Sequence, residues 1–527
     1  MDHYPWLSPP DHTAQALRMD HHLWHYGQLM THAELLSRAI DWSIAGPLRL
    51  LAILGNQDPW VYPAMLAAHR LGGGFLPLHP AFPSERLQHM LHQCQTRLLL
   101  VTSDGLATLD QLLPNLSDSM LCIITEDTKG NRPLLFPQHR FLDSTDLQQL
   151  PARPAHPAPN TQAAYVMFTS GSTGRAKGVA VSFANLHAYV RYWQTHHPIG
   201  PGDRVAQPAD ITFDLSIHPI FVSWASGALL CPIPPATRFA PARFILEQQL
   251  TVWVSVPSVA MMMERLNILR PALFPTIRLS LFCGEPLPTR TAEAWRQSTP
   301  QGRLLNLYGP TEATVAISAF EWQAESAQQE PPGNVPIGWT FPEQQAALLQ
   351  EDGSLLLSAG TGDLCLAGSQ VTGGYLADPD KSAAHYFYHP DSGATLWYRT
   401  GDWVQRREDG CLLFLNRVDQ QIKRHGYRIE LHEIEHVLRA RVGHDWVAVI
   451  PWPGGTQPVR ALVACVAAEE NSPTADWLQH CRQHLPSYMV PSRIMVVPQL
   501  PLNHNGKINR AALQQLVQAT LFPTEAT

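Results

Sequence analysis

The 527-residue chain lacks the cysteine spacing that would predict a metal centre or a disulfide framework. Its eight cysteines lie far apart, at positions 94, 122, 231, 283, 365, 411, 465 and 481, and no Cys-x-x-Cys occurs. A large chain that is not secreted keeps such cysteines most simply as buried thiols. No zinc site is therefore predicted, and a reducing compartment is expected.

Basic clusters and membrane-length apolar runs are absent as well. The net charge is −7 and no block of lysine and arginine occurs, which argues against general nucleic-acid binding. Apolar runs such as 98–101 and 447–450 have the length of strands, far below the roughly 20 residues of a membrane helix. No signal peptide is predicted at residues 1–10. With 45% hydrophobic and 15% charged residues, a folded cytoplasmic enzyme is expected.

The chain does contain a stretch of hydroxyl residues and glycines directly after an apolar, β-prone run at 165–168. Glycines accept positive φ and let an anion approach the backbone, while hydroxyls and a lysine add donors and charge. The spacing is neither that of a P-loop nor that of the dinucleotide-binding fingerprint. A mobile linker is the alternative interpretation. We predict a phosphate-binding loop at a strand exit, made of Thr169, Ser170, Gly171, Ser172, Thr173, Gly174 and Lys177.

Short apolar runs alternate with helical patterns along most of the chain. This alternation predicts layered α/β subdomains with largely parallel sheets. A proline-rich segment at 151–161 is expected to be a stiff connector that leads to the phosphate-binding loop. The predicted strands are 50–54, 98–102, 121–125, 229–233 and 252–256, and a helix is predicted at 60–71.

A second change of pattern, near residues 402–421, predicts a domain boundary. It divides the chain into a core at 1–416 and a C-terminal domain at 417–527, whose size is that of a small α+β domain. Within the C-terminal domain, helices are predicted at 433–441 and 474–484, and strands at 447–451 and 461–467.

Three further segments carry side chains suited to a nucleotide. In segment 306–314, Tyr308 could stack on a base, Thr311 could bind a phosphate and Glu312 could hold Mg²⁺, which prefers oxygen ligands. Asp402 is expected to end a short strand, where its carboxylate could accept hydrogen bonds from a ribose diol. Lys507 follows a flexible Asn-Gly turn. Each of these segments alone would be an ordinary turn or a solvated side chain.

Together, and in this order, these segments resemble the adenylate-forming superfamily of acyl- and aryl-CoA ligases, luciferases and peptide-synthetase adenylation domains. The resemblance covers roughly residues 30–515, and segments 72–87, 362–376 and 485–491 support it. It implies a large N-terminal domain of layered α/β subdomains followed by a small, mobile C-terminal α+β domain.

Within the superfamily, Phe213-Asp-Leu-Ser216 resembles the branch that activates amino acids, where Asp214 would pair with the substrate ammonium. An acyl-CoA ligase has no reason to bury an unpaired carboxylate beside an acyl chain. A helix N-cap is the alternative role. The local sequence is most similar to that of stand-alone D-alanine:carrier-protein ligases. That resemblance implies a side-chain pocket made of Leu215, His218, Ser255, Leu281, Cys283, Leu307, Val315 and Ala316.

Four positions depart from those ligases. His218 stands where they usually have Met, and Leu307 where they have Thr. Asn416 replaces a Gly, and His79 replaces an Asp. The substrate therefore stays open among D-alanine, glycine, L-alanine, serine and proline.

The resemblance also implies a two-step reaction with ATP and Mg²⁺. Lys507 would bridge carboxylate and phosphate oxygens while aminoacyl-AMP forms, with Glu312 on the metal. The C-terminal domain would then rotate about Asp419 and present Gly426 to the phosphopantetheine thiol of a separate carrier protein, because too little chain follows Lys507 for a carrier domain. The nucleotide contacts would come from the phosphate-binding loop and from Gly284, Glu285, Asn306, Tyr308, Thr311, Asp402 and Arg417. An acyl- or aryl-CoA ligase and a non-catalytic nucleotide-binding protein are the alternatives.

Overall fold

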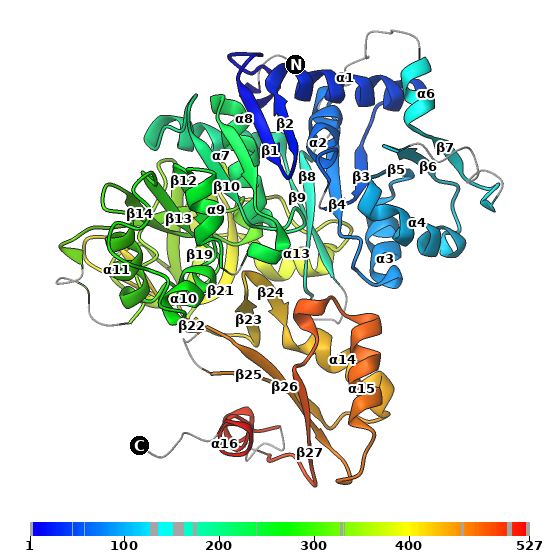
Figure 1. Cartoon of the computed structure of the whole chain (residues 1–527). Coiled ribbons are helices and arrows are strands. Elements are labelled where there is room, and N and C mark those ends of the chain that lie inside the picture. The colour runs from blue at the N-terminus through cyan, green and yellow to red at the C-terminus, as the bar shows by residue number, and fades with distance from the viewer. Residues whose placement is uncertain are drawn as a thin grey trace.

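The computed structural model describes most of the chain. Three sheets form a large N-terminal part, and a two-stranded hairpin and a three-stranded sheet belong to a smaller C-terminal part below it (Figure 1). The described residues are 4–44, 46–56, 58–126, 135–150, 163–171, 176–238, 240–326, 330, 333–454, 458–502 and 508–522. The connector predicted at 151–161 lies outside these ranges.

The first sheet has seven strands, all parallel except for the last pair. Apolar side chains alternate along its central strand, so that Leu51 and Ile53 face one helix layer while Ala52 and Leu54 face the other. Its strands, in spatial order, are β7 (Arg140–Leu142), β6 (Leu121–Ile124), β5 (Leu98–Val101), β3 (Leu50–Leu54), β4 (Gly74–Leu78), β8 (Tyr165–Thr169) and β9 (Lys177–Val181). The helices of this region are α1 (Tyr26–Ser43), α2 (Val61–Arg70), α3 (Ser84–Cys94), α4 (Leu106–Leu112) and α6 (Ser144–Gln149).

The second sheet has nine strands with a parallel centre and antiparallel edges. Its strands, in spatial order, are β16 (Trp339–Thr340), β15 (Ser318–Trp322), β14 (Arg303–Tyr308), β13 (Leu279–Phe282), β12 (Val252–Ser255), β10 (Arg204–Gln207), β11 (Leu229–Pro232), β1 (Gln15–Met19) and β2 (His22–His25). The helices are α7 (Phe183–His196), α8 (Ile217–Ser226), α9 (Ala242–Glu247), α10 (Pro257–Arg265) and α11 (Thr289–Ser298). One core cluster joins α7 and α8 to α1 and α2, so these helices are packed between the first two sheets.

The third sheet is antiparallel throughout, so the prediction of largely parallel sheets holds only for the first two. It comprises β18 (Leu355–Leu356), β17 (Gln344–Leu349), β19 (Gly360–Gly368), β21 (Leu396–Arg406), β20 (Tyr386–Tyr388) and β22 (Leu412–Arg417), with α13 (Pro379–His385) beside β20. Its core includes Tyr308 from the end of β14, which fixes this sheet against the second one.

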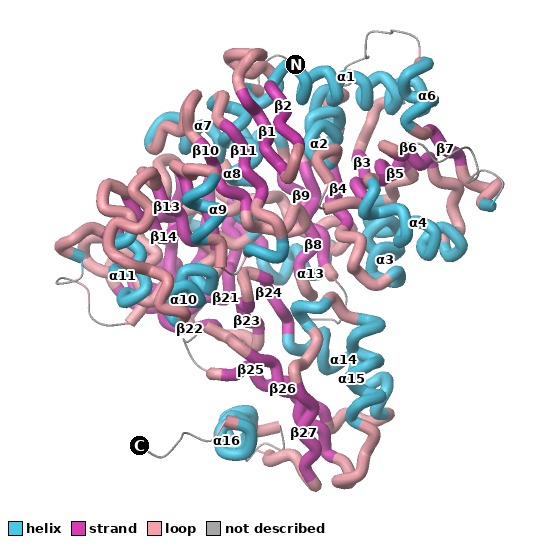
Figure 2. The backbone as a smooth tube through the Cα atoms, in the orientation of Figure 1, coloured by secondary structure: helices cyan, strands magenta, loops and turns pink. Residues whose placement is uncertain are grey.

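The C-terminal part begins with a hairpin of β23 (Gln421–Arg424) and β24 (Tyr427–Glu430), which lies between the large part and a three-stranded sheet (Figure 2). That sheet carries α14 and α15 on one face and α16 on the other. Its elements are α14 (Leu431–Val442), β25 (Val447–Trp452), β26 (Ala461–Ala467), α15 (Thr474–His484), β27 (Arg493–Val497) and α16 (Arg510–Leu521). The helices and strands predicted here are confirmed, while the boundary between residues 416 and 417 stays a prediction.

Candidate functional site

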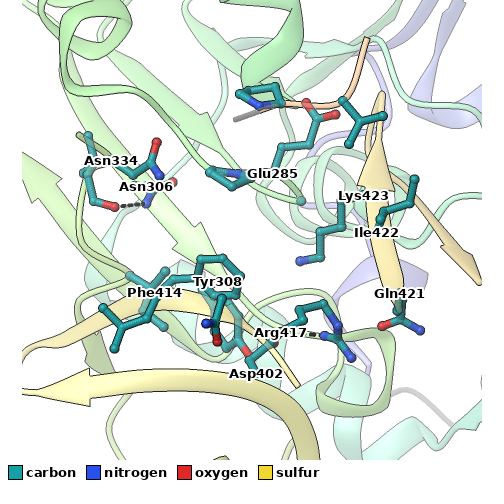
Figure 3. Close-up of a pocket in the computed structure, with 18 of the residues that line it drawn as sticks. Glu285, Asn306, Tyr308, Asn334, Asp402, Phe414, Arg417, Gln421, Ile422 and Lys423 are labelled. Atoms are coloured by element: carbon teal, nitrogen blue, oxygen red, sulfur yellow. Dashed lines mark hydrogen bonds and ion pairs between the residues drawn. The ribbon is translucent and has the colours of Figure 1, made fainter. Parts of the chain in front are cut away.

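A cavity of about 480 Å³ lies where the ends of β13 and β14, the third sheet and the hairpin meet (Figure 3). Six of the predicted nucleotide-binding residues line it: Gly284, Glu285, Asn306, Tyr308, Asp402 and Arg417. The amide of Asn306 donates to the carbonyls of Val335 and Pro336, at 3.2 and 2.9 Å, whereas its buried Oδ1 has no partner among the described residues. A buried acceptor without a donor is unfavourable, so this cavity suits a ligand that brings an N–H group.

Asp402 forms a hydrogen-bonded group with Tyr308 and Arg417. Its carboxylate accepts from Tyr308 Oη and from Arg417 Nη1, each at 2.5 Å. The prediction that Asp402 ends a strand is wrong, because β21 continues to Arg406. The strand continues through a register irregularity near Gly401, whose φ is +74°. Such bulges redirect a side chain without ending the strand. Asp419, the predicted hinge, also pairs with Arg417, at 2.6 Å.

Glu312 is fully buried and has two cationic partners. Arg428 Nη1 lies 2.7 Å from its Oε2, Lys177 Nζ lies 3.5 Å from its Oε1, and Tyr375 Oη donates to Oε1 at 2.7 Å. Burial alone would raise the pKa of Glu312, but Arg428 and Lys177 hold it well below its usual range. Glu312 is therefore ionised and dependent on nearby positive charge.

The C-terminal part occupies the described end of the phosphate-binding loop. The Gly171 N–H donates to Glu433 Oε2 at 3.2 Å, and Ser170 Oγ accepts from the Glu430 N–H at 2.9 Å. Ser170 Oγ also donates to the Arg428 carbonyl, at 2.6 Å. Thr169 ends β8, and its buried Oγ1 has no partner among the described residues. Ser172, Thr173, Gly174 and Lys507 lie outside the described residues.

A second, small cavity of about 30 Å³ adjoins the first, and buried Asp214 lines it. Of the predicted side-chain pocket, Leu215, Cys283 and Val315 line this cavity, and so does Thr311. The remaining members do not line it: Leu307 faces the large cavity, Ser255 faces a third one, and His218, Leu281 and Ala316 are buried elsewhere.

His218 is fully buried beside Tyr189, whose hydroxyl lies 2.9 Å from the Nδ1 atom of His218. Burial lowers the pKa of His218 to about 3, so the ring is neutral. The ring of His218 packs against Trp193, with the ring centroids 4.5 Å apart, and does not line the small cavity.

Val315 forms part of the wall of the small cavity and has φ +69°. A β-branched residue in the left-handed region is strained. The carbonyl of the next residue, Ala316, accepts a hydrogen bond from Gln370 Nε2 at 2.7 Å. This strained backbone holds a branched side chain against the cavity.

A third cavity of about 350 Å³ lies on the other side of the hairpin tip, between Phe213, Val256, Tyr427 and Tyr488. Arg238 and Arg424 also line it. Gly426, at the hairpin tip, donates its N–H to Glu285 Oε1 at 3.0 Å. The hairpin tip therefore reaches the predicted nucleotide-binding residues.

Two functional features were missed in the sequence. Arg428 contacts Glu312 and Glu433 contacts Gly171, and only Glu433 lies in a segment for which the sequence predicted a helix. Residues 432–436 also read His-Glu-Ile-Glu-His, the spacing of a zinc-protease motif. Within the described part of the chain, no group of three or more His, Cys, Asp or Glu residues could hold a metal ion, and Glu433 is bound to Arg86 and Gly171.

The predicted pairing of Asp214 with a substrate ammonium implies that amino-acid binding depends on pH. Burial raises the pKa of Asp214 to about 6, and Glu312 adds to the effect, while a hydrogen bond from Thr311 and the charge of Lys423 oppose it. Below pH 6 the carboxylate gains a proton and loses its attraction for an ammonium group. We expect kcat/KM for the amino acid to fall by about tenfold between pH 7 and pH 5. Asp214→Asn should be poorly active at every pH, and its kcat/KM should not fall between pH 7 and pH 5. If that fall persisted in the variant, Asp214 would not be the group that titrates.

Comparison with known proteins matches this chain to AMP-binding enzymes and to carrier-protein ligases. Residues 7–376 match the AMP-binding enzyme family, and residues 433–507 match the AMP-binding enzyme C-terminal domain. An L-proline--[L-prolyl-carrier protein] ligase of Pseudomonas fluorescens is 33% identical over 457 residues, 86% of each chain. A D-alanine--D-alanyl carrier protein ligase of Bacillus licheniformis is 28% identical and covers 93% of this chain and 94% of its own.

Among solved structures, the Vibrio cholerae adenylation domain AlmE in complex with glycyl-adenosine-5'-phosphate aligns with a TM-score of 0.87 and 34% identity, over 98% of this chain and 96% of AlmE. In the described residues, no helix is long and apolar enough to cross a membrane.

Proposed function

Because this chain belongs to the AMP-binding enzyme family, we propose that it is a free-standing amino acid:carrier protein ligase. It uses ATP to convert an amino acid into aminoacyl-AMP and then transfers the aminoacyl group to the phosphopantetheine thiol of a separate carrier protein. The activities of the proline and D-alanine relatives, both of them carrier-protein ligases, support this proposal. The observation that carries it is the buried carboxylate of Asp214 in a small cavity that adjoins a larger one. We also assign the enzyme to the cytoplasm.

The large cavity is suited to adenosine. The Tyr308 ring provides a stacking face, the unpartnered Oδ1 of Asn306 provides an acceptor for an exocyclic amino group, and Asp402 provides a carboxylate for the ribose hydroxyls. Gly284, Glu285 and Arg417 complete this set. Ser170, Gly171 and Lys177 would hold phosphates, together with the loop residues that are not described.

Mg²⁺ would be held by Glu312. A buried carboxylate that already depends on two cations fits a divalent metal ion when Arg428 is withdrawn. The metal would neutralise phosphate charge while the amino-acid carboxylate attacks the α-phosphorus, with Lys507 as the lysine of that step.

The third cavity is suited to the pantetheine arm. It leads along the hairpin past Gly426, and its apolar walls with Arg238 and Arg424 suit a narrow thiol chain that ends in a phosphate. Gly426 would then border the path of the thiol, and Asp419 would be the hinge that brings the hairpin into place.

We further propose that glycine is the preferred amino acid. A cavity of about 30 Å³ beside Asp214 leaves room for an ammonium group and little else, because Leu215, Cys283 and Val315 close it. The bound glycyl adenylate of AlmE supports this choice. One additional methyl group in such a space would reduce specificity by about tenfold or more.

Amino-acid-dependent ATP–pyrophosphate exchange tests both proposals. Glycine should give the highest kcat/KM, followed by alanine of either chirality, with serine and proline weaker. Val315→Gly should shift the preference toward alanine by about tenfold, because it widens the cavity and also relieves the strain at φ +69°. Thr314→Gly is the matched control, since Thr314 has φ +58° but does not line the cavity.

The possible outcomes separate the substrate from the reaction class. Preference for another amino acid would contradict the choice of glycine alone. Exchange only with fatty or aryl acids would favour an acyl- or aryl-CoA ligase, and exchange with no acid would favour a non-catalytic nucleotide-binding protein.

A further inference from the structure

His425, at the tip of the hairpin, has no role so far. Strands β23 and β24 are joined by only two residues, because Arg424 pairs directly with Tyr427. These two residues, His425 and Gly426, have φ of +51° and +82°, and positive φ at both central positions is what a type I′ turn requires. Asn followed by Gly is the preferred sequence of such a turn, whereas His is only tolerated there. The turn itself therefore gives no reason for a histidine.

The hairpin tip lies between two cavities. His425 lines the third cavity, to which we assign the pantetheine arm, while Gly426 lines the small cavity beside Asp214. A thiol that advances from the third cavity toward an aminoacyl group beside Asp214 therefore passes the hairpin tip.

The transfer step requires the thiol to lose its proton. The thiolate is the nucleophile, and a free alkyl thiol such as that of cysteine has a pKa of about 8.5. Only a few per cent of such a thiol is ionised at about pH 7. A positioned base that removes the proton during attack accelerates such a step by about 10²–10⁴-fold. A base that lines the third cavity would therefore have a large effect on transfer.

The ionisable side chains of the third cavity differ in their ability to act as a base. Those that line it are Asp210, Arg238, Arg424, His425, Tyr427 and Tyr488. The two arginines have no acceptor and keep their protons. Burial raises the pKa of Tyr427 well above its usual value and that of Tyr488 to about 12. Both tyrosines are therefore neutral at pH 7 and do not accept a proton.

Asp210 and His425 remain. Burial opposes the ionisation of Asp210, but the hydrogen bond and charge of His79, whose Nε2 lies 3.1 Å from Oδ2, help to lower the pKa of Asp210 to about 2. So weak a base does not hold a proton at neutral pH. Burial lowers the pKa of His425, the charge of Glu285 opposes this shift, and Arg424 adds to it. The imidazole of His425 is therefore neutral at pH 7 and can accept a proton.

Glu285 is held where its charge can stabilise a protonated His425. Its Oε1 accepts the Gly426 N–H and its Oε2 accepts the Ser258 N–H, each at 3.0 Å. A fixed carboxylate that stabilises an imidazolium is the usual support for a histidine base beside its nucleophile. Glu285 belongs to the large part and His425 to the C-terminal part, so the two come together when the hairpin is seated in the site.

We propose that His425 is the general base that removes the proton of the phosphopantetheine thiol during transfer, and that Glu285 stabilises its protonated form. This inference rests on the proposed function. A ring nitrogen of His425 takes the thiol proton while the sulfur bonds to the carbonyl carbon of aminoacyl-AMP. The bond from that carbon to the phosphate oxygen breaks, AMP leaves with the electron pair, and the imidazolium then gives its proton to solvent. The base thus enters the site with the hairpin, in the step that needs it.

His425→Asn tests the proposal, because it removes the base and keeps the preferred sequence of the turn. Transfer is measured in single turnovers from saturating supplied aminoacyl-AMP to free phosphopantetheine, with whichever amino acid supports exchange in the wild type. At pH 7 the transfer rate should fall about a hundredfold, while pyrophosphate exchange stays within about twofold of the wild type. At pH 9 the loss should shrink to about tenfold or less, because the thiol then ionises without a base.

Two further variants make the test more specific. His436→Asn makes the same change on α14, outside the third cavity, and should keep both rates at both pH values. Glu285→Gln keeps a hydrogen-bond acceptor for Gly426 but removes the charge. Since that charge raises the pKa of His425, the pH below which transfer declines should be lower in Glu285→Gln than in the wild type.

Unchanged transfer in His425→Asn would overturn the proposal. A loss of transfer equally large at pH 7 and pH 9 would also overturn it, since His425 would then only shape the hairpin tip, and so would an equal loss of exchange. Retained exchange shows that the variant folds. If Glu285→Gln left the pH profile of transfer unchanged, the role given to Glu285 would be wrong. Absence of exchange with every acid in the wild type would instead contradict the proposed function itself.

Discussion

Gly426→Ala is expected to lose transfer to phosphopantetheine by about a hundredfold or more while retaining pyrophosphate exchange. Gly426 has φ +82°, and a Cβ atom there would lie 2.5 Å from Val256 Cγ1 and 2.8 Å from Phe213 Cε1. The left-handed backbone and the overlap both oppose seating the hairpin tip in the site. Adenylation should persist, because the proposed mechanism withdraws the hairpin from the site during that step. Single-turnover transfer from supplied aminoacyl-AMP and pyrophosphate exchange measure the two steps separately.

Gly443→Ala is the control for the backbone effect. Gly443 has φ +86° at the end of α14, and a Cβ atom there would meet nothing within 4 Å. It should lose stability only through its backbone conformation and keep both steps. If Gly443→Ala lost transfer as severely as Gly426→Ala, the contact at the hairpin tip would not be the cause.

Lys507→Ala should show the opposite profile, with exchange reduced about a thousandfold and transfer from supplied aminoacyl-AMP largely retained. The residue itself lies outside the described ranges. α16, which begins three residues later, lies at the end of the C-terminal part away from the large part (Figure 1). In the orientation described, the hairpin and not this end of the domain occupies the site.

The control for this second prediction is Lys381→Ala, which removes a lysine from α13 and should leave both rates unchanged. Equal losses of exchange and transfer in Lys507→Ala would contradict the division of the reaction between two orientations of the C-terminal part.

Local patterns were sufficient to predict most of the elements. The strand at 50–54 and the helix at 474–484 have the predicted bounds, because strong apolar periodicity and flanking turn residues define them. Asp402 was misplaced because a strand with an irregularity at a glycine looks, in sequence, like a strand that ends there. The antiparallel third sheet was missed because its long-range pairing leaves no local signal.

The composition of the site was predicted better than its geometry. Motifs identified Asp214, Glu312 and Asp402, all of which lie at the site. They could not show which residues behind Asp214 reach the cavity, because that depends on packing between β13, β14 and the backbone at Val315. Nor could they predict the contacts of Arg428 with Glu312 or of Glu433 with Gly171, which join residues far apart in the chain and require one orientation of the C-terminal part.

The contacts of Glu433 with Gly171 and of Arg428 with Glu312 affect how readily ATP binds. Glu433 already accepts the Gly171 N–H, and Arg428 already pairs with Glu312, so the enzyme holds its own anion and cation where the nucleotide and its metal ion would bind. An incoming triphosphate must compete with part of the same polypeptide. Its apparent affinity is therefore weaker than the intrinsic one by the fraction of molecules whose hairpin is withdrawn. Substitutions that weaken this self-occupancy, such as Glu433→Gln, would tighten ATP binding even as they disfavour the orientation needed for transfer.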